Sequence, residues 1–201
     1  MYFAGIIVIL LVLLVAFSLV LPGNTRPCDA LVHPDKLNNF AVYADGVTLL
    51  GVVDATLPNI TPLKETNKGA GIAGEYETSA VGQFSSMKLQ MTWRMATMQA
   101  ALLARPDGMM LELRAAAQGI DSSTFKFKQS PIKVTVRACA SDLQLGKFDP
   151  AAAMGTTTEV ECLYYKFTYD GVVIHEIDKL NFKAIIGGVD VLEEVNKILG
   201  R

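Results

Sequence analysis

Regular alternation of apolar and polar side chains is the feature that most limits how this chain can fold. It is clear in four windows, at residues 88–94, 111–115, 125–128 and 132–138. In the last window the apolar row is Ile132, Val134, Val136 and Ala138, and the polar row is Lys133, Thr135 and Arg137. A period of two places one row on a buried face and the other row in water. The pattern predicts a mainly β fold made of antiparallel sheets with one wet face.

Two Asp-Gly pairs predict the turns of β-hairpins. Asp45-Gly46 divides the apolar-rich segment 36–58, and Asp170-Gly171 divides strands expected at 159–169 and 172–177. Asp-Gly is a preferred pair at two-residue hairpin turns, because its backbone conformation matches the twist of the strands.

Two short helices are also predicted. The first spans 98–104, with Thr97 as its N-cap and Pro106 beyond its end. The second spans about 191–199, where Asp190 and Glu193 have the spacing of a capping box. Residues 57–84 and 146–158 contain prolines and glycines without a clear period, and are predicted to be irregular.

Composition excludes several classes of protein. The formal net charge is −2, so the chain has no overall positive field to hold nucleic acid on its outer surface. Three cysteines, Cys28, Cys139 and Cys162, lack paired spacing and do not predict a disulfide framework. We expect Cys139 and Cys162 to be reduced thiols within strands, which suits a reducing cytoplasm.

The N-terminal segment differs from the rest of the chain. Residues 3–21 form an apolar run broken only by Gly5 and Ser18, long enough to cross a bilayer as a helix. We therefore divide the chain into residues 1–30 and a domain at 31–201. Two interpretations of 1–30 stay open: a transmembrane helix, or upstream sequence translated from an incorrectly assigned start codon.

Three glycines, Gly69, Gly71 and Gly74, match the dinucleotide-binding spacing G-x-G-x-x-G. That motif works when a strand precedes it and a helix follows it, so that the phosphates meet a helix N-terminus. Here the preceding segment is polar and the following one has no helical period. We interpret the glycines as the tip of a loop that lies against a neighbour.

No other motif predicts a catalytic or metal site. Cys139, Cys162 and His175 lack the short paired spacing of structural zinc ligands. No histidine is placed by sequence to activate a serine, and we predict no catalytic residue and no cofactor. The cations on the predicted wet faces are interpreted as partners in ion pairs across strands, with phosphate contact as the alternative. They are Lys88, Arg94, Arg114, Lys126, Lys128, Lys133 and Arg137.

Three motifs occur in a fixed order: KLNNF at 36–40, VYADG at 42–46 and GAGIAGE at 69–75. With them, residues 34–200 resemble the major tail tube protein of contractile-tailed phages and phage-tail-like bacteriocins. The resemblance implies an antiparallel β-sandwich or barrel subunit with one or two short helices. Six copies would form a ring with a shared inner β-barrel, and stacked rings would form a conduit for DNA ejection inside the sheath.

The resemblance also implies where subunits meet. Residues 36–40 match a region near the subunit contact, and 64–85 match a loop that reaches an adjacent ring. The contact candidates are Lys36, Leu37, Phe40, Lys64, Gly69, Gly71, Gly74, Glu75 and Phe84.

The same resemblance implies the partners and the location. The partners are further copies of the chain, the tail sheath protein, baseplate and tail terminator proteins, and the tape-measure protein and DNA in the lumen. The location is the tail tube of a virion assembled in the host cytoplasm. A translated 3–21 segment would add contact with a membrane. The alternative hypothesis is a membrane-anchored β-domain that acts as a monomeric binding module.

Overall fold

A computed structural model describes residues 32–200, which fall into two compact parts. The larger part contains residues 34–119 and 129–200, and the smaller part contains 32–33 and 120–128. The strands are β1 (Val32–Ala44), β2 (Thr48–Leu50), β3 (Asp54–Thr56), β4 (Pro62–Lys68), β5 (Glu75–Phe84), β6 (Lys88–Trp93), β7 (Met109–Asp121), β8 (Phe127–Gln144), β9 (Thr156–Tyr169), β10 (Val172–Asp178), β11 (Lys183–Ile186) and β12 (Val189–Asp190). The helices are α2 (Met98–Leu102) and α3 (Glu193–Ile198).

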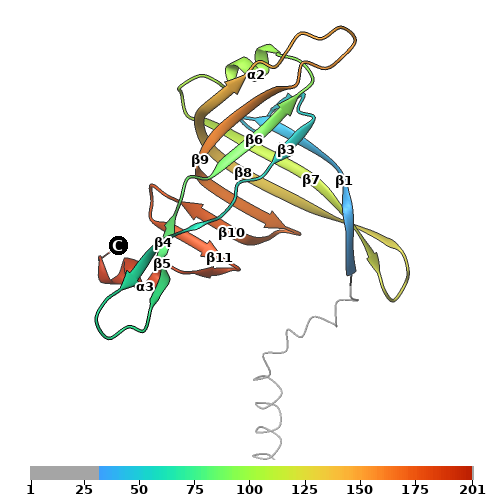
Figure 1. Cartoon of the computed structure of the whole chain (residues 1–201). Helices are drawn as coiled ribbons and strands as arrows, with labels where there is room; N and C mark the ends of the chain where they lie inside the picture. The colour runs from blue at the N-terminus through green and yellow to red at the C-terminus, as the bar shows by residue number, and fades with distance from the viewer. Residues whose placement is uncertain (1–31, 201) are drawn as a thin grey trace, which may run out of the picture. The chain divides into compact units, whose positions relative to one another are not determined.

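The strands form one large sheet and one separate hairpin, which confirms the predicted mainly antiparallel β fold. The large sheet runs β12-β11-β10-β9-β8-β7-β1-β2, and β3 joins it through β6. Strand β9 pairs along its first half with β6 and along its second half with β10. Figure 1 shows β3 and β6 crossing over β1, β7 and β8. The long strand β9 therefore connects β3 and β6 to the rest of the sheet.

The core lies where the predicted alternation placed it in the windows 88–94, 111–115 and 132–138. In the window 125–128 the prediction is wrong, because Phe125 and Phe127 are 83% and 67% exposed. Every second residue of β6 is buried, ending at Trp93, and the same holds for Val134, Val136 and Ala138 of β8. The indole Nε1 of Trp93 donates to Thr158 Oγ1 at 3.1 Å, so the buried ring has a polar partner. Burial of such side chains is the main favourable contribution to folding.

Both predicted hairpins are present, but only Asp170-Gly171 forms the predicted two-residue turn. Asp170 and Gly171 have positive φ angles of 48° and 79°, and Tyr169 pairs directly with Val172. At the other hairpin Ala44 pairs with Thr48, so Val47 joins Asp45 and Gly46 in a three-residue loop.

The two helices differ in how well the sequence located them. Thr97 caps α2 as predicted, because its side chain accepts from the backbone N–H of Ala100 at 3.3 Å. The prediction for α3 is wrong at its start: Leu192 is the N-cap, and Asp190 accepts from the N–H of Leu192 at 2.9 Å. Asp190 still belongs to β12, where it pairs with Ile185, so the helix begins later than the capping-box spacing indicates. Glu193 and Lys197, four residues apart on the helix, form an ion pair in which Lys197 Nζ lies 2.6 Å from Glu193 Oε1.

The outer face of the sheet is less open to water than the alternation suggested. Glu112 is only 5% exposed, because Arg114 and Lys133 hold its carboxylate, with Lys133 Nζ at 3.0 Å. Burial alone would raise the pKa of Glu112, but hydrogen bonds from these two cations lower it. The prediction of ion pairs across strands is confirmed here and at Lys88–Glu159, which lies at 2.6 Å.

The two described cysteines lie in strands, as predicted, and neither forms a disulfide. Cys162 is fully buried, and that burial, reinforced by the charge of Glu161, raises the pKa of its thiol to about 12. Cys28 lies outside the described residues, and so does the segment 3–21 for which a membrane span was predicted. Within 32–200, no helix has the length and apolar character to cross a bilayer.

Candidate functional site

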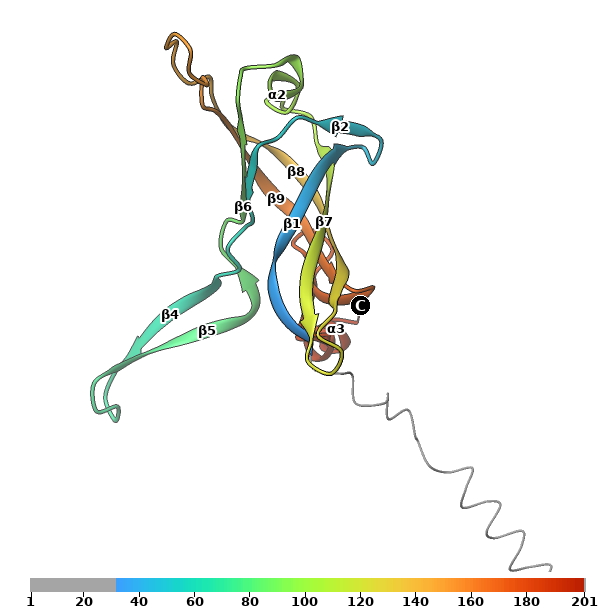
Figure 2. The same cartoon turned by 90° about the vertical axis from the view of Figure 1, so that its right-hand side faces the viewer.

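Strands β4 and β5 form a hairpin where the sequence predicted an irregular segment. Lys64 pairs with Ser79, Thr66 with Glu77, and Lys68 with Glu75 in an antiparallel two-stranded sheet. In Figures 1 and 2 this hairpin lies apart from β1 and β7. The prediction of an irregular 57–84 segment is therefore wrong for most of its length.

The three glycines lie in the turn at the tip of the hairpin. Gly71 and Gly74 have φ angles of +94° and +115°, which side chains rarely adopt. The N–H of Ile72 donates to Gly69 O at 3.2 Å and closes the turn. A strand leads into the glycines and another strand leaves them, so the helix that dinucleotide binding requires is not at this place. The interpretation as a loop tip is confirmed, whereas contact with a neighbour stays a prediction.

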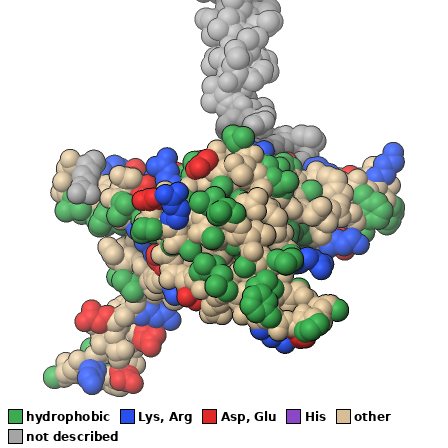
Figure 3. All heavy atoms as spheres, turned by 90° about the horizontal axis from the view of Figure 1, so that it is seen from above, with side chains coloured by type: hydrophobic (Ala, Val, Ile, Leu, Met, Phe, Trp, Pro, Cys, Tyr) green, Lys and Arg blue, Asp and Glu red, His purple; other side chains and the backbone are tan. Residues whose placement is uncertain are grey.

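The hairpin has no core of its own. From residue 63 to 81 every residue except the half-buried Asn67 is exposed. The exposed side chains include Leu63 at 46%, Tyr76 at 51% and Val81 at 63%. Figure 3 shows acidic and basic side chains along the projecting arm at the lower left. An isolated two-stranded hairpin is marginally stable in water, so contacts beyond its two strands must hold it.

Polar contacts within the hairpin are few and lie at its surface. Lys64 and Glu77 form an exposed ion pair at 3.4 Å, and Asn67 Nδ2 donates to Thr78 Oγ1 at 2.7 Å. Exposed pairs of this kind contribute little to stability. Phe84, another predicted contact residue, is half-buried and packs against the core at the base of the hairpin. Its contact with a neighbouring subunit stays a prediction.

The predicted residues of β1 lie along a strand edge that is open for most of its length. Strand β2 pairs only with Val42, Tyr43 and Ala44. The other neighbour of β1 among the described strands is β7, so one edge of residues 34–41 is left without a strand. Open edges of this kind pair readily with another chain.

An apolar groove lies beside the same segment of β1. Its volume is about 320 Å³, and Leu37 and Phe40 line it together with Leu57, Leu113, Ile132 and Phe167. Leu37 is 49% exposed, whereas Phe40 is half-buried against the core. Lys36 is exposed, and its Nζ forms an ion pair with Asp35 Oδ2 at 3.6 Å. The structure thus places the predicted residues at two surfaces, the β1 edge with its groove and the β4–β5 hairpin.

Sequence reasoning missed the apolar residues of the hairpin. Ile72, Tyr76 and Val81 are exposed there but were not among the contact candidates. No periodic signal marks them, because neither face of the hairpin is buried.

Within the described part of the chain, no three His, Cys, Asp or Glu side chains are grouped closely enough to hold a metal ion. The arrangement offers backbone edges and apolar side chains, which suit contacts between protein chains.

A comparison with known protein families decides the class of the protein. Residues 34–200 match the family described as phage tail tube protein FII. The chain belongs to this tail tube family. The resemblance of residues 34–200 to tail tube proteins is confirmed, and the two surfaces described above both lie inside the matched range.

This tail tube family member is similar to a phage protein and to chains in two solved structures. The tail tube protein of Escherichia phage P2 is 27% identical over 181 residues, which cover 85% of this chain and 99% of the phage protein. The sheath/tube terminator of an extracellular contractile injection system, PVC, superposes with a TM-score of 0.48 at 9% identity, over 69% of this chain and 99% of that one. A chain of the PVC sheath-tube complex gives a TM-score of 0.46 at 11% identity, over 69% and 94%.

Proposed function

We propose that this chain is the structural subunit of the tube of a contractile tail. Six copies form a ring, and rings stack into a hollow conduit for DNA inside the sheath. Membership of the tail tube family over residues 34–200 carries the proposal. The role is assembly and not catalysis.

The open edge of β1 supports the formation of a ring. A strand edge without a partner is satisfied when a neighbouring subunit continues the sheet, and closure of a ring removes the remaining edges. Residues 34–41 offer such an edge next to the apolar groove lined by Leu37 and Phe40. We assign Lys36, Leu37 and Phe40 to the contact between subunits of one ring.

The β4–β5 hairpin supports the stacking of rings. A hairpin without its own core gains stability when its exposed apolar side chains are covered by another chain. A contact between two different surfaces of identical subunits repeats without closing, and so it builds an open stack. We assign the predicted hairpin residues to the contact with an adjacent ring, and Phe84 also supports the hairpin base. They are Lys64, Gly69, Gly71, Gly74, Glu75 and Phe84.

The further partners follow from the same assignment. They are the sheath protein outside the tube, the terminator and baseplate proteins at its ends, and the tape-measure protein and DNA inside it. The tube belongs to a virion assembled in the cytoplasm of the host. We retain the division into residues 1–30 and a tube domain at 31–201. Residues 1–30 are either a transmembrane helix, with membrane contact through 3–21, or upstream sequence translated from an incorrectly assigned start codon.

Negative-stain electron microscopy of the purified chain tests the proposal. We expect tubes with sixfold end views, both from the full chain and from one that starts at Leu31. Leu37→Asp should prevent rings, whereas Ile72→Asp at the hairpin tip should leave rings that stack poorly. A protein that stays monomeric at high concentration and with its baseplate would overturn the proposal. A monomer found only in membranes would favour the binding module instead.

A further inference from the structure

The carboxylate of Glu161 joins three segments that are far apart in the sequence. It lies on β9 and accepts hydrogen bonds from Ser86 Oγ and, at 3.2 Å, from the backbone N–H of Met87. Lys179, just after β10, donates to the same carboxylate at 3.0 Å. Ser86 and Met87 are the link between the β4–β5 hairpin and β6, so the contacts meet at the base of the hairpin.

Lys179 ties the hairpin to the sheet a second time. Its Nζ also donates to the backbone carbonyl of Ser85 at 3.0 Å. Lys179 and Glu161 are both partly buried, with 22% and 28% of their side chains exposed. Charge-assisted hydrogen bonds in partly buried positions are stronger than exposed ion pairs.

The electrostatic state of Glu161 agrees with this arrangement. Burial by itself raises the pKa of Glu161, but the hydrogen bonds from Ser86, Lys179 and Met87 together lower it. The group is therefore a carboxylate at neutral pH, held by three donors.

A steric contact also restrains the same end of the hairpin. Gly82 of β5 packs against the buried side chain of Leu192, just before α3. Gly82 and Lys179 also line one small pocket of about 130 Å³, together with Phe84 and Leu192. The polar and the apolar contacts thus act at the same base, and the rest of the hairpin is exposed.

We propose that Glu161 is a positioning residue that fixes the direction of the β4–β5 hairpin within each subunit, before subunits meet. It acts through Ser86 and Lys179, and the contact of Gly82 with Leu192 completes the restraint. A hairpin oriented in advance loses less conformational freedom when it docks, so assembly is more favourable. The use of the hairpin in assembly rests on the proposed function, whereas the restraint is a property of the single subunit.

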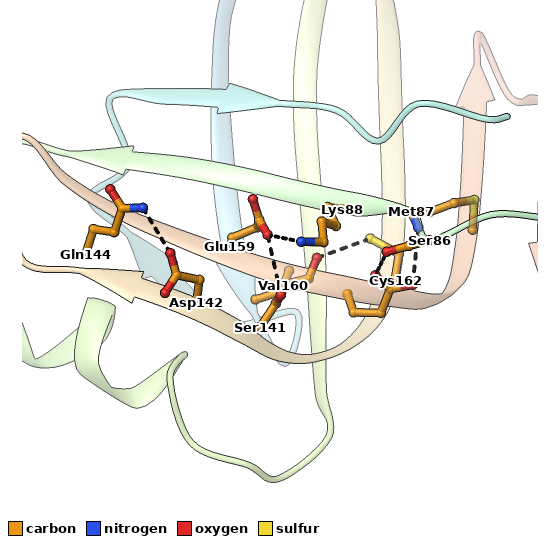
Figure 4. A network of polar contacts seen from close by, with 10 residues as sticks. Ser86, Met87, Lys88, Ser141, Asp142, Gln144, Glu159, Val160 and Cys162 are labelled. Atoms are coloured by element: carbon orange, nitrogen blue, oxygen red, sulfur yellow. Dashed lines mark hydrogen bonds and ion pairs between the residues drawn. The ribbon is translucent and has the colours of Figure 1, made fainter.

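Strand β9 supplies a matched control. Glu159 lies two residues from Glu161 and also pairs with a lysine, Lys88, at 2.6 Å. Figure 4 shows Glu159 with its partners Lys88 and Ser141, and shows Ser86 and Met87 in the segment that leads into β6. Glu159 has no contact with the hairpin base among its described partners.

Distances between two spin labels test the proposal on single subunits. Labels at Tyr76→Cys in the hairpin and Val172→Cys in the sheet are introduced into the full chain with Cys28→Ser and Cys139→Ser. Cys162 is buried and stays unlabelled. Dilution into unlabelled protein removes the signal between subunits, and a total protein concentration too low for assembly keeps neighbouring subunits away from the hairpin. Pulsed electron resonance then gives the distance distribution within one unassembled subunit.

We expect a narrow distribution in the parent, one about twofold wider in Glu161→Gln, and no change in Glu159→Gln. Ser86→Ala removes a single donor and should widen the distribution less, which keeps the test open if Glu161→Gln fails to fold. An unchanged width in both Glu161→Gln and Ser86→Ala would overturn the proposal, and so would equal widening in Glu159→Gln. Electron microscopy of the same variants measures tube formation separately. A chain that never assembles would contradict the proposed function, but it would leave the positioning of the hairpin by Glu161 intact.

Discussion

Leu192 occupies the space that a side chain at Gly82 would need. A Cβ at residue 82 would lie within 2.9 Å of three carbon atoms of Leu192, which is only 3% exposed. Strand β5 and the segment before α3 can approach this closely only because residue 82 is glycine. The backbone there also has a positive φ of 67°, which favours glycine for a second reason.

Gly82→Ala should therefore destabilise the subunit more than Gly71→Ala. Both glycines have positive φ angles, but a Cβ at Gly71 would meet open space. We expect the overlap with Leu192 to lower the free energy of unfolding by a further 1–3 kcal/mol, roughly, in urea titrations. Leu192→Ala should remove most of this difference in a double-mutant cycle. Equal costs at the two glycines would show that packing at Gly82 is loose.

Glu112→Gln should lower stability because it leaves two cations without their shared carboxylate. Arg114 and Lys133 are each half exposed, so water offsets part of the loss. We expect a decrease of about 1–2 kcal/mol in the free energy of unfolding. Glu77→Gln, which breaks the exposed pair with Lys64, is the control and should cause no measurable change. If Glu112→Gln leaves the free energy of unfolding unchanged, the buried carboxylate does not contribute to stability.

The subunit should lose stability in acid. Burial raises the pKa values of Glu112, Glu161 and Glu176, but hydrogen bonds from neighbouring cations and hydroxyl groups lower all three below the ordinary 4.5. The unfolded chain therefore takes up protons first as the pH falls. Their contribution is complete above pH 4.5 and is lost as the pH falls through the lower folded values.

Urea midpoints measured from pH 7 to about pH 3 would show this loss. A triple Gln variant at these three positions should have a flatter pH profile. Stability that rises on acidification would contradict the assignment.

Thr158→Val should destabilise the core although the two side chains have nearly the same shape. The change removes the acceptor of Trp93 Nε1 and leaves a buried N–H without a partner. We expect the free energy of unfolding to fall by about 1–3 kcal/mol. The fluorescence of the single tryptophan can be used to monitor unfolding. Thr157→Val changes the half-buried neighbour on the same strand and should have a smaller effect. A larger effect at Thr157 would argue that the Trp93 hydrogen bond is not important.

The parts of the fold that follow a local pattern were predictable from the sequence. Alternation located β6, β7 and β8, Asp170-Gly171 located a tight turn, and Thr97 located the start of α2. Each of these signals depends on residues close together in the chain. The β4–β5 hairpin was missed for the same reason, because it buries neither face and so shows no apolar period.

The sequence by itself determined which residues alternate toward a core, where the chain turns sharply, and to which family it belongs. Only the tertiary structure decided that Glu112 is buried, that Gly82 meets Leu192, and that Glu161 gathers Ser86 and Lys179. The physical reason is separation along the chain: Ser86 and Glu161 are 75 residues apart. A local period records whether a residue is buried, but it carries no information on which distant strand covers it.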